Sequence, residues 1–466
     1  MLFFVKEKDM TKEDIKKYVM EPILSKGYKV YFVGGCVRDS LLGEEPHDYD
    51  LVTDATPEQL HTIFDKFSGQ NSEPFGVTMP IIKNELIEIA TMRKDITKGR
   101  HPKIEYTTSL EEDAFRRDFT VNTLYEDRNG NIIDPTNGVK DLFKRELKFV
   151  GNPVERIAED PLRVFRFCRF QAQKGLKPSL TEEQMNEIIK KVSEPNFYSE
   201  VSKERILKEF IGILGGNYFM KEEDLTLNYM RLFKVADALG LEKIFEDMEN
   251  TSQNPAWHSE GSTYNHTILV MREMAKEKHD WIDMLGAMLH DIGKPISASR
   301  KEKKREQDFW YQVKDHPITG APAAELFCKN LKMSNNDVKI IKELVLLHMD
   351  MHKLSNVTSK YKKLKIYTNP IFDRLVKLCR SDSNGSKPIF QDEWEDIDTV
   401  MKKDKELIGI SMPEPIVTGN DLIEAGIKPS EFFKKALEVA HKVQIDQDIT
   451  DKKVLLNNIL KIAKGK

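Results

Sequence analysis

The chain has 466 residues, of which 39% are hydrophobic and 32% are charged, a composition typical of a folded, helix-rich protein with several cores. At roughly 150 residues per domain, this length predicts about three domains, and the absence of a run of 18 apolar residues predicts no membrane-spanning helix. The formal net charge of -4 argues mildly against RNA binding, although the 72 basic residues leave room for a local positive surface.

The N-terminal segment MLFFVKEKDM has lysines and acids directly after a very short apolar run, unlike a secretory signal. The four cysteines are scattered without paired spacing, which argues against a disulfide framework or a zinc knuckle. Together these features predict a protein of the reducing cytoplasm.

The first segment with recognisable chemistry is an apolar strand predicted over residues 30–33, followed by Gly34, Gly35 and a short helix. Backbone N–H groups at such a turn and helix start can face a phosphate, and Arg38 adds a fixed positive charge. A pair of glycines alone is a weak signal, so the neighbouring residues decide its meaning.

The next predicted strand, HDYDLV at residues 47–52, carries Asp48 and Asp50 on the same face, roughly 6 to 7 Å apart along the backbone. A solvated strand edge is the ordinary explanation for such a pair. The alternative is two carboxylates that share Mg²⁺ ions, whose charge removes the repulsion. Beside the glycine turn, the acids predict a triphosphate site next to a metal site, as in phosphoryl transfer with two ions about 4 Å apart.

Three further residues add to this prediction. Glu88 lies on an alternating stretch and could reach the same sheet face as the aspartates, or it could be a plain exposed strand residue. Arg117 offers a donor fork to triphosphate oxygens, and Asp118 can accept a hydrogen bond from a ribose hydroxyl. An isolated Arg-Arg-Asp is otherwise a surface patch.

The segment EDPLRVFRFCRF at residues 159–170 places Asp160 and Arg163 three residues apart, as neighbours on one helical face. Asp160 could simply cap the helix that starts near Pro161. A carboxylate beside a guanidinium also matches the pairing edges of cytosine and adenine, which offer an amino donor next to a ring nitrogen acceptor. Guanine or uracil would leave these groups unpaired, at about 1 to 3 kcal/mol per contact.

Beyond residue 255 the sequence carries a series of histidines and aspartates in or beside helical stretches: His266, His290, Asp291, His316, His348 and Asp382. Each histidine alone is more simply explained as an ordinary residue of a helix face. As a set, imidazoles with carboxylates suit a transition metal, here Mn, Ni, Fe or Zn, which could activate a water for phosphoester hydrolysis.

Six segments, in their order along the chain, resemble the signature of the class II tRNA nucleotidyltransferases, the CCA-adding enzymes, and of the related bacterial poly(A) polymerases. They are GGCVRDSLLGEEPHDYDLVT, EIATMRKD, RRDFTVNTL, DPTNGVKDL, EDPLRVFRFCRF and VSKERILKEF, within residues 30–210. The resemblance implies that Asp160 and Arg163 select CTP and ATP. It also marks Arg166 and Arg169 as nucleotide contacts, although Arg169 could instead pair with a neighbouring acid.

The later histidines and aspartates resemble the H…HD…H…H…D ligand set of the HD phosphohydrolase superfamily. This resemblance implies cyclic phosphodiesterase or phosphatase action on RNA 3′ ends, although some relatives keep the domain only as a scaffold. The tail is similar to that of the CCA-adding family, but Lys428-Pro429-Ser430 and Phe432-Phe433 stand where relatives carry a glycine-rich turn. A tRNA contact by the tail is therefore an open question.

The predicted fold is α+β. It comprises a nucleotidyltransferase head with a mixed β-sheet (1–150), followed by all-helical regions: a base-selecting and RNA-binding neck (151–255), an HD domain (256–400) and a tail (401–466). The predicted reaction adds C, C and A to tRNA 3′ ends from CTP and ATP, with Mg²⁺ in the head.

Three alternatives remain open. The first is a poly(A) polymerase, although the strongly basic C-terminal extension of that type is absent. The second is an enzyme that adds only CC or only A, a choice that depends on segments such as 92–108. The third, from another class, is chiefly an HD metal-dependent phosphohydrolase with an inactive head. The sequence does not specify the oligomeric state.

Overall fold

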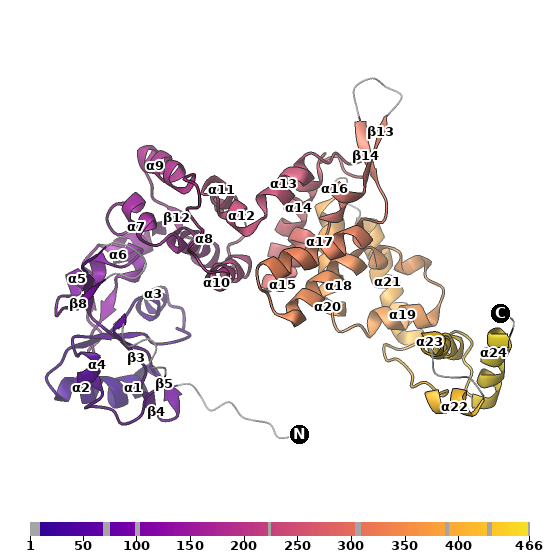
Figure 1. Cartoon of the computed structure of the whole chain (residues 1–466), viewed down its shortest axis with the longest axis horizontal. Helices are drawn as coiled ribbons and strands as arrows, with labels where there is room; N and C mark the ends of the chain where they lie inside the picture. Colours follow the sequence, from indigo (N-terminus) through magenta and orange to yellow (C-terminus); the bar gives the residue numbers. More distant parts are fainter. Residues whose placement is uncertain are drawn as a thin grey trace. The chain divides into compact units, whose positions relative to one another are not determined.

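The computed structural model describes residues 10–68, 75–97, 103–221, 225–302, 309–386, 391–425 and 431–464. The backbone divides into two compact units, Met1–Leu239 and Gly240–Lys466, and each is described by itself (Figure 1). The four predicted regions subdivide the chain more finely, and their boundaries stay predictions.

The first unit combines short strands with helices. Its strands are β1 (Val30–Val33), β2 (Leu51–Thr53), β3 (Val77–Thr78), β4 (Ile81–Ile82), β5 (Glu85–Leu86), β6 (Ile89–Thr91), β7 (Arg93–Asp95), β8 (Ile104–Tyr106), β9 (Tyr125–Glu126), β10 (Ile132–Ile133), β11 (Glu146–Leu147) and β12 (Lys177–Pro178). Its helices are α1 (Lys12–Ile15), η1 (Lys16–Met20), α2 (Glu21–Ser25), α3 (Gly35–Leu41), α4 (Pro57–Leu60), α5 (Leu110–Phe115), η3 (Thr120–Asn122), α6 (Gly138–Phe143), α7 (Pro153–Glu159), α8 (Leu162–Lys174), α9 (Glu182–Val192), α10 (Lys203–Leu214), α11 (Leu225–Leu232) and α12 (Val235–Leu239).

The main sheet has six strands in the order β10-β9-β1-β2-β6-β3. Strands β2 and β6 are parallel, with Leu51 opposite Ile89, whereas the other neighbours in this sheet are antiparallel. The predicted mixed sheet is therefore confirmed. The parallel pair matters for function because residues that precede β2 and β6 meet at the same edge of the sheet.

The predicted strand over residues 47–52 begins later than expected. Strand β2 starts at Leu51, and Asp48 and Asp50 lie directly before it. All three residues of β2 are buried, and the strand lies between β1 and β6. A carboxylate within such a strand would be buried at a large desolvation cost, so the acids lie at the strand's open end.

The glycine turn lies where the sequence predicts it, between β1 and α3. Gly34 has φ +72° and ψ -117°, a conformation that residues with a Cβ avoid, and Gly35 begins α3. The N–H of Gly34 donates to the carbonyl of Leu124 at 3.0 Å, which ties the turn to the segment before β9.

The second unit is largely helical. Its helices are α13 (Glu242–Glu249), α14 (Thr263–Lys276), α15 (Trp281–Leu289), α16 (Gly293–Ser297), α17 (His316–Asn330), α18 (Asn335–His352), η4 (Leu354–Asn356), α19 (Lys360–Tyr367), α20 (Phe372–Gly385), α21 (Gln391–Leu407), α22 (Gly419–Glu424), α23 (Glu431–Asp446) and α24 (Lys452–Lys464). In Figure 1, α14–α18 and α20 gather in one bundle, where α14 packs on α20 and α17 on α18.

The helical character predicted after the head is confirmed, with two additions. Strands β13 (Ala298–Glu302) and β14 (Phe309–Val313) form an antiparallel hairpin within the predicted HD region, and β11 and β12 form a short parallel pair. The run Phe309-Trp310-Tyr311 consists of aromatic residues, which favour strands over helices, and this accounts for β14.

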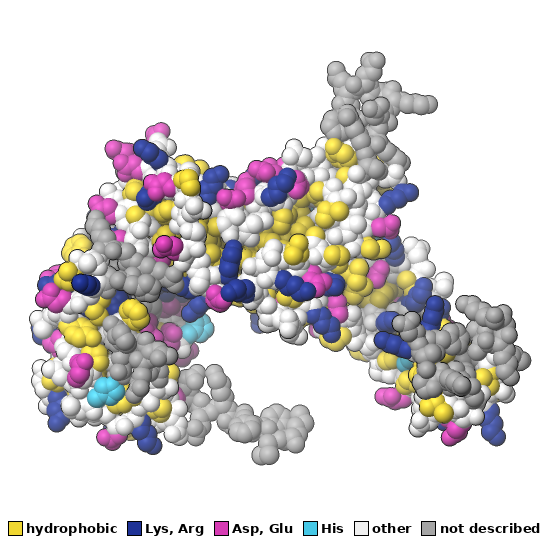
Figure 2. Space-filling view, in the orientation of Figure 1, with side chains coloured by type: hydrophobic (Ala, Val, Ile, Leu, Met, Phe, Trp, Pro, Cys, Tyr) yellow, Lys and Arg dark blue, Asp and Glu magenta, His cyan; other side chains and the backbone are white. Residues whose placement is uncertain are grey.

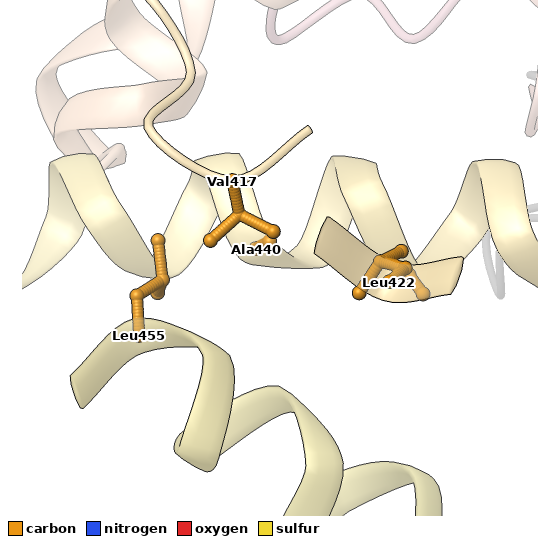
Figure 3. Packing of buried hydrophobic residues seen from close by; sticks show 5 residues of the cluster. Val417, Leu422, Ala440 and Leu455 are labelled. Carbon is orange, nitrogen blue, oxygen red and sulfur yellow. The ribbon is translucent and has the colours of Figure 1, made fainter. Parts of the chain in front are cut away.

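The end of the chain has its own small core, made by the segment before α22 and by α22, α23 and α24. Val417, Leu422, Ala436, Ala440 and Leu455 are buried there, as the close view of Figure 3 shows. Phe433 packs against this cluster, whereas Lys428, Pro429 and Ser430, and the side chain of Phe432, lie outside the described residues. A tRNA contact by the tail stays a prediction.

This small core offers a stability test. Replacing fully buried Leu455 by alanine is expected to lower the opening free energy of α22–α24 by about 2 to 4 kcal/mol, because a cavity replaces the leucine side chain. Hydrogen–deuterium exchange of residues 413–458 measures this loss, and Val454→Ala at the neighbouring exposed position is the control. Unchanged protection in Leu455→Ala would contradict the packing described.

Side chains of both charges are interspersed over the face drawn in Figure 2, where no single-sign field covers the described surface of either unit. Among the described residues, no helix is both long and apolar enough to cross a bilayer. The four cysteines are buried, and none of them takes part in a disulfide.

Candidate active sites

Three carboxylates gather at the edge of the main sheet. Asp50 directly precedes β2 and Glu88 directly precedes β6, and the N–H of Leu51 donates to the carbonyl of Glu88 at 3.2 Å. Burial raises the pKa of Asp50 to about 6, and the charges of Asp48 and Glu88 add to this effect, whereas Arg117 opposes it. The structure thus brings together the three acids that the sequence singled out.

These carboxylates fit a divalent cation. Asp50 is half-buried and Asp48 and Glu88 are exposed, so their oxygens can be reached from solvent. Burial and the charges of Asp48 and Glu88 together disfavour the ionised form of Asp50 and raise its pKa, and Arg117 offsets them only in part. Hard carboxylate oxygens around uncompensated negative charge are the donors that Mg²⁺ prefers.

The glycine turn and two arginines form a corner next to these acids. A Cβ on Gly34 would lie 3.8 Å from Nη1 of Arg117 and 3.6 Å from the carbonyl of Asn122, so the turn lies beside both groups, and its positive φ rather than a lack of space favours glycine. Nε and Nη2 of Arg117 donate to Oδ2 of buried Asp113 at 3.0 and 2.9 Å. These bonds fix the guanidinium, which leaves Nη1 for another acceptor.

Arg38 and Asp118 are joined through Asn122, a residue to which sequence reasoning gave no role. Nη1 of Arg38 donates to Oδ1 of Asn122 at 2.7 Å, and Nδ2 of Asn122 donates to Oδ1 of Asp118 at 2.9 Å. The other oxygen of Asp118 accepts from Nε of Arg166 at 2.6 Å. Burial opposes the charge of Asp118, but Arg166 and Asn122 outweigh it and lower its pKa to about 2.

Asp160 and Arg163 do not form the direct helical pair that their spacing predicts. Asp160 directly follows the last residue of α7 and has an extended backbone with φ -142°, because proline disfavours helical geometry in the residue before it. Helix α8 starts only after Pro161. Oδ1 of Asp160 accepts from the N–H of Leu162 at 3.1 Å, so the capping interaction anticipated as an alternative is present.

The partners of the two side chains are different residues. Oδ2 of Asp160 accepts from Nη2 of Arg205 on α10 at 2.9 Å. Nη1 of Arg163 donates to Oε2 of Glu159 at 2.8 Å, and Nη2 donates to the carbonyl of Arg116 at 3.0 Å. Both Asp160 and Arg163 nevertheless line one cavity of about 590 Å³, together with residues 93–97 from β7 onward.

The remaining arginines of α8 are held by acids. Arg166 pairs with Asp118, and Nε of Arg169 lies 2.7 Å from Oε2 of Glu209 on α10. Arg169 therefore has the acidic partner that was considered for it, and its contact with a nucleotide stays a prediction. Arg205 and Glu209 lie four apart in VSKERILKEF, a spacing that places both on one face of α10.

In the second unit, the six predicted residues converge from α14, α17, α18, α20 and the segment after α15. Two groups share Asp291: His266 and His290 on one side, and His316 and His348 on the other. Oδ2 of Asp291 lies 3.1 Å from Nε2 of His290, and Oδ1 lies 3.3 Å from Nε2 of His316. Oδ1 of Asp382 lies 2.9 Å from Nε2 of His266.

The histidine rings are oriented so that their Nε2 atoms face this centre. Nδ1 of His290 bonds the carbonyl of Ala287 at 2.9 Å, and Nδ1 of His348 bonds the carbonyl of Val345 at 2.8 Å. Because each Nδ1 must donate to its carbonyl, each Nε2 carries the lone pair. Nε2 of His290 is buried and makes no hydrogen bond, so its lone pair suits a metal ion.

The charge states at this centre follow from burial and contact. Burial lowers the pKa of His316 to about 4 and that of His348 to about 3, so both are neutral at pH 7. Burial opposes the charge of Asp291, but His290 and Lys294 outweigh it and hold its pKa well below the usual range. His316 and His348 are thus neutral imidazoles beside an ionised carboxylate, the forms that bind transition metals. Burial opposes the charge of His266, but Asp382 and Glu260 outweigh it and raise its pKa to about 9, so a metal ion would displace a proton there.

A glycine brings the parts of this centre together. A Cβ on Gly293 would lie 2.0 Å from the carbonyl of His316, so only glycine allows α16 to approach α17 this closely. Lys294, one residue later, places Nζ 2.6 Å from Oδ2 of Asp291. The segment HDIGK (290–294) thus supplies two predicted metal ligands, the glycine that lets α16 pack closely on α17, and a buried lysine.

Sequence reasoning missed several residues near this centre. Lys294 follows Asp291 by three residues in a helical stretch, a spacing that could have revealed it. His352 lies one turn after His348, and its Nε2 is 3.1 Å from Oδ2 of Asp382. His258 and Glu260 precede the first predicted ligand, and no spacing rule marks them.

Two family models match the chain: the poly A polymerase head domain over residues 30–148 and the HD domain over residues 263–383. A CCA-adding enzyme of Ligilactobacillus salivarius is 29% identical over 463 residues, which cover 96% of both chains. A CCA-adding enzyme of Streptococcus gordonii is 34% identical over 249 residues, 51% of this chain and 61% of that protein, so this match spans less than two thirds of the relative.

Solved structures agree on the fold. The CCA-adding enzyme of Bacillus stearothermophilus in complex with CTP superimposes with a TM-score of 0.69 at 21% identity, and the alignment covers 98% of this chain and 99% of that one. The Thermotoga maritima CCA-adding enzyme complexed with tRNA gives 0.56 at 16% identity, with coverage of 97% and 96%. The chain thus carries a poly A polymerase head domain and an HD domain, and over its full length it is similar to a CCA-adding enzyme.

Proposed function

We propose that the protein adds C, C and A to the 3′ end of tRNA, using CTP and ATP and no nucleic-acid template. The observation that carries this proposal is the convergence of Asp48, Asp50 and Glu88 beside the corner formed by Gly34 and Arg117. The cavity lined by Asp160 and Arg163 belongs to the same unit. Similarity to CCA-adding enzymes over the full chain favours this reaction over poly(A) synthesis.

In this proposal Asp48 and Asp50 hold two Mg²⁺ ions, with Glu88 as a third nearby carboxylate. When bound, these ions lower the pKa of the tRNA 3′-hydroxyl and neutralise charge on the leaving pyrophosphate. The triphosphate is held by Arg38, Arg117 and backbone groups of Gly34 and Gly35.

The network around Asn122 orients the nucleotide. Asp118 is ionised, and its Oδ1 accepts from Asn122 and from the N–H of Phe119 while Oδ2 accepts from Arg166, which leaves a lone pair on Oδ2 for a ribose hydroxyl. Arg166 and Arg169 are held by Asp118 and Glu209, so their positive charge is offset and their place is fixed. Both therefore act as rigid nucleotide contacts rather than as free cations.

Asp160 and Arg163 select the base from the wall of the 590 Å³ cavity. Asp160 accepts from the exocyclic amino group of cytosine or adenine, and Arg205 holds its carboxylate in place. Arg163 donates to the ring nitrogen with an N–H left over from its bonds to Glu159 and to the carbonyls of Arg156 and Arg116. Each unmatched contact with guanine or uracil costs about 1 to 3 kcal/mol, so rejection is about tenfold to hundredfold per contact.

We further propose a hydrolytic activity of the HD centre on phosphoesters at RNA 3′ ends. The buried set of His266, His290, Asp291, His316, His348 and Asp382, divided into two groups that share Asp291, favours one or two transition-metal ions such as Mn, Ni, Fe or Zn. When bound, such ions supply an activated water. Buried Lys294 places a positive charge at the same centre.

Product lengths test the proposed addition. The protein is incubated with tRNA transcripts that end before CCA or after CC, and CTP and ATP are given singly and together. We expect two additions with CTP alone on the first transcript, three with both nucleotides, and one with ATP on the second. A long homopolymer of A would support a poly(A) polymerase, and arrest after CC with both nucleotides would support a partial enzyme.

The pKa of Asp50 predicts how the magnesium requirement depends on pH. Asp50 binds a cation only when deprotonated, and its pKa is raised to about 6 before the cation binds. We therefore expect the Mg²⁺ concentration for half-maximal incorporation to be constant above about pH 7 and to rise about tenfold per pH unit below about pH 6. Measurement at each pH checks this, and a flat profile down to about pH 5 would contradict it.

We expect the protein to act in the cytoplasm, where its proposed partners, the tRNA 3′ end, CTP and ATP, are available.

A further inference from the structure

The segment Thr251–Ser262 precedes α14 and lies before the residues matched by the HD domain model. It is closed into a loop by hydrogen bonds from the N–H of Thr263 to the carbonyl of Thr251 and from the N–H of Gln253 to the carbonyl of Gly261, at 2.9 and 2.8 Å. Two of its side chains reach the HD centre, which makes the loop a part of that site.

The first of these side chains is Glu260, a carboxylate with only 4% exposure. Its Oε1 is hydrogen-bonded to Nδ1 of His258 at 2.8 Å and lies 3.1 Å from Nδ1 of His266, a buried atom that makes no hydrogen bond in this structure. A buried carboxylate is costly unless charged or polar groups surround it, so this position requires a reason. The imidazoles of His258 and His266 lie next to this carboxylate, and His266 is a proposed metal ligand.

His266 follows the arrangement of the other histidines, with one difference. Its Nε2 faces the centre, as the Nε2 atoms of His290 and His348 do, but it is hydrogen-bonded to Oδ1 of Asp382 at 2.9 Å, so it holds a proton that a metal ion would displace. The Nδ1 atoms of His290 and His348 bond backbone carbonyls, whereas Nδ1 of His266 faces a side-chain carboxylate. Such a carboxylate fixes the tautomer and raises the basicity of the ligand nitrogen.

We propose that Glu260 is a positioning residue of the HD metal centre. It accepts the Nδ1 proton of His266 when a metal ion displaces the proton that Nε2 shares with Asp382, so that the Nε2 lone pair is directed at the metal, and it is itself held by His258 from the other side. This inference rests on the proposed metal centre and extends it beyond the HD domain model.

The second side chain, Gln253, ties the same loop to the opposite part of the centre. Its Oε1 accepts from Nζ of Lys294 at 2.6 Å, and the same Nζ lies 2.6 Å from Oδ2 of Asp291. Gln253 and Lys294 are both buried. The loop therefore contacts the centre at two points, through Glu260 to His266 and through Gln253 to Lys294.

A direct ligand role for Glu260 is the competing explanation, because His258, Glu260 and His266 also form a compact group. A metal ion there would need Nδ1 of His266 while Nε2 serves the main centre. Both nitrogens would then have to be deprotonated in one imidazole. Acceptance of the Nδ1 proton by Glu260 requires no such state.

Metal binding by the full chain tests the inference. Metal-free protein carrying D48N and D50N, which weaken the head site, is titrated with Mn²⁺ by calorimetry. E260Q and E260A are compared with E246Q, the same change at an exposed position of α13. We expect the Mn²⁺ dissociation constant to rise about tenfold in E260Q and up to about a hundredfold in E260A, with unchanged stoichiometry and no effect of E246Q.

The other outcomes are decisive as well. Affinities within about twofold of the parent would overturn the positioning role, and the loss of one ion per chain in E260A would make Glu260 a ligand instead. The H348A variant separates this from failure of the centre itself. The parent protein should bind Mn²⁺ that the H348A variant does not bind. If the two bind equally, the proposed metal centre is wrong, and the positioning role of Glu260 is wrong with it.

Discussion

Replacing Asp48 and Asp50 together by asparagine is expected to lower nucleotide incorporation by at least about a thousandfold, or about 4 kcal/mol of transition-state stabilisation. Both substitutions keep the size of the side chain and remove the negative charge that holds Mg²⁺. Primer extension on tRNA lacking CCA measures the loss. Release of phosphate at the HD centre is expected to remain, because that centre lies in the other unit.

The fold is expected to survive this change. Burial and the charges of Asp48 and Glu88 disfavour the ionised form of Asp50, so removal of charge relieves repulsion rather than creating it. Asp65→Asn, an exposed site of the same unit, is the matched control and should retain activity. Undiminished incorporation by a folded double variant would refute the role of these acids.

Replacing Asp291 by asparagine is expected to abolish phosphoester hydrolysis while nucleotide incorporation continues. Asp291 contacts both histidine groups, so its loss affects both proposed metal positions at once. Phosphate release from a 2′,3′-cyclic phosphate substrate and from a 3′-phosphate, with added Mn²⁺ or Ni²⁺, measures the effect. Asp373→Asn, an exposed position on α20, serves as the control.

Two results would contradict this expectation. Equal hydrolysis by Asp291→Asn would place the activity elsewhere. No hydrolysis by the unmodified protein with any of these metals would leave the HD helices as a scaffold. In either case incorporation by the head is a separate measurement, since it depends on Asp48 and Asp50.

The features that the sequence predicted well are local ones. The end of β1, the glycine turn and the start of α3 follow from an apolar run, two glycines and helix formers within about a dozen residues. The mixed sheet agrees with the resemblance over residues 30–210. The convergence of the HD residues is not local, since His266 and Asp382 are 116 residues apart, and it followed from the resemblance of the ordered ligand set to the HD superfamily.

The features that the sequence did not predict depend on contacts between distant segments. Asp160 and Arg163 were assigned to one helical face by spacing, but Pro161 separates them and each is held by another residue. The pairing of Asp160 with Arg205 spans 45 residues, and Lys294 meets Gln253 across 41 residues. No periodicity records such pairs, because they arise only when helices pack.

The start of β2 is a further case in which packing decides. Strand propensity and alternation extend the predicted strand over Asp48 and Asp50, yet β2 is buried along its whole length and begins at Leu51. The desolvation cost of a carboxylate overrides the local pattern. The acids therefore lie at the sheet edge, where a cation and a nucleotide can reach them.

Selection of the base by protein side chains is tested most directly by comparing kcat/KM for the four nucleoside triphosphates, in the intact protein and in Asp160→Asn. In the intact protein, kcat/KM for CTP on tRNA lacking CCA, and for ATP on tRNA ending in CC, is expected to exceed kcat/KM for GTP and UTP by at least about a hundredfold. The Asp160→Asn variant is expected to reduce this ratio. Use of GTP and UTP as readily as CTP and ATP by the intact protein would contradict this selection.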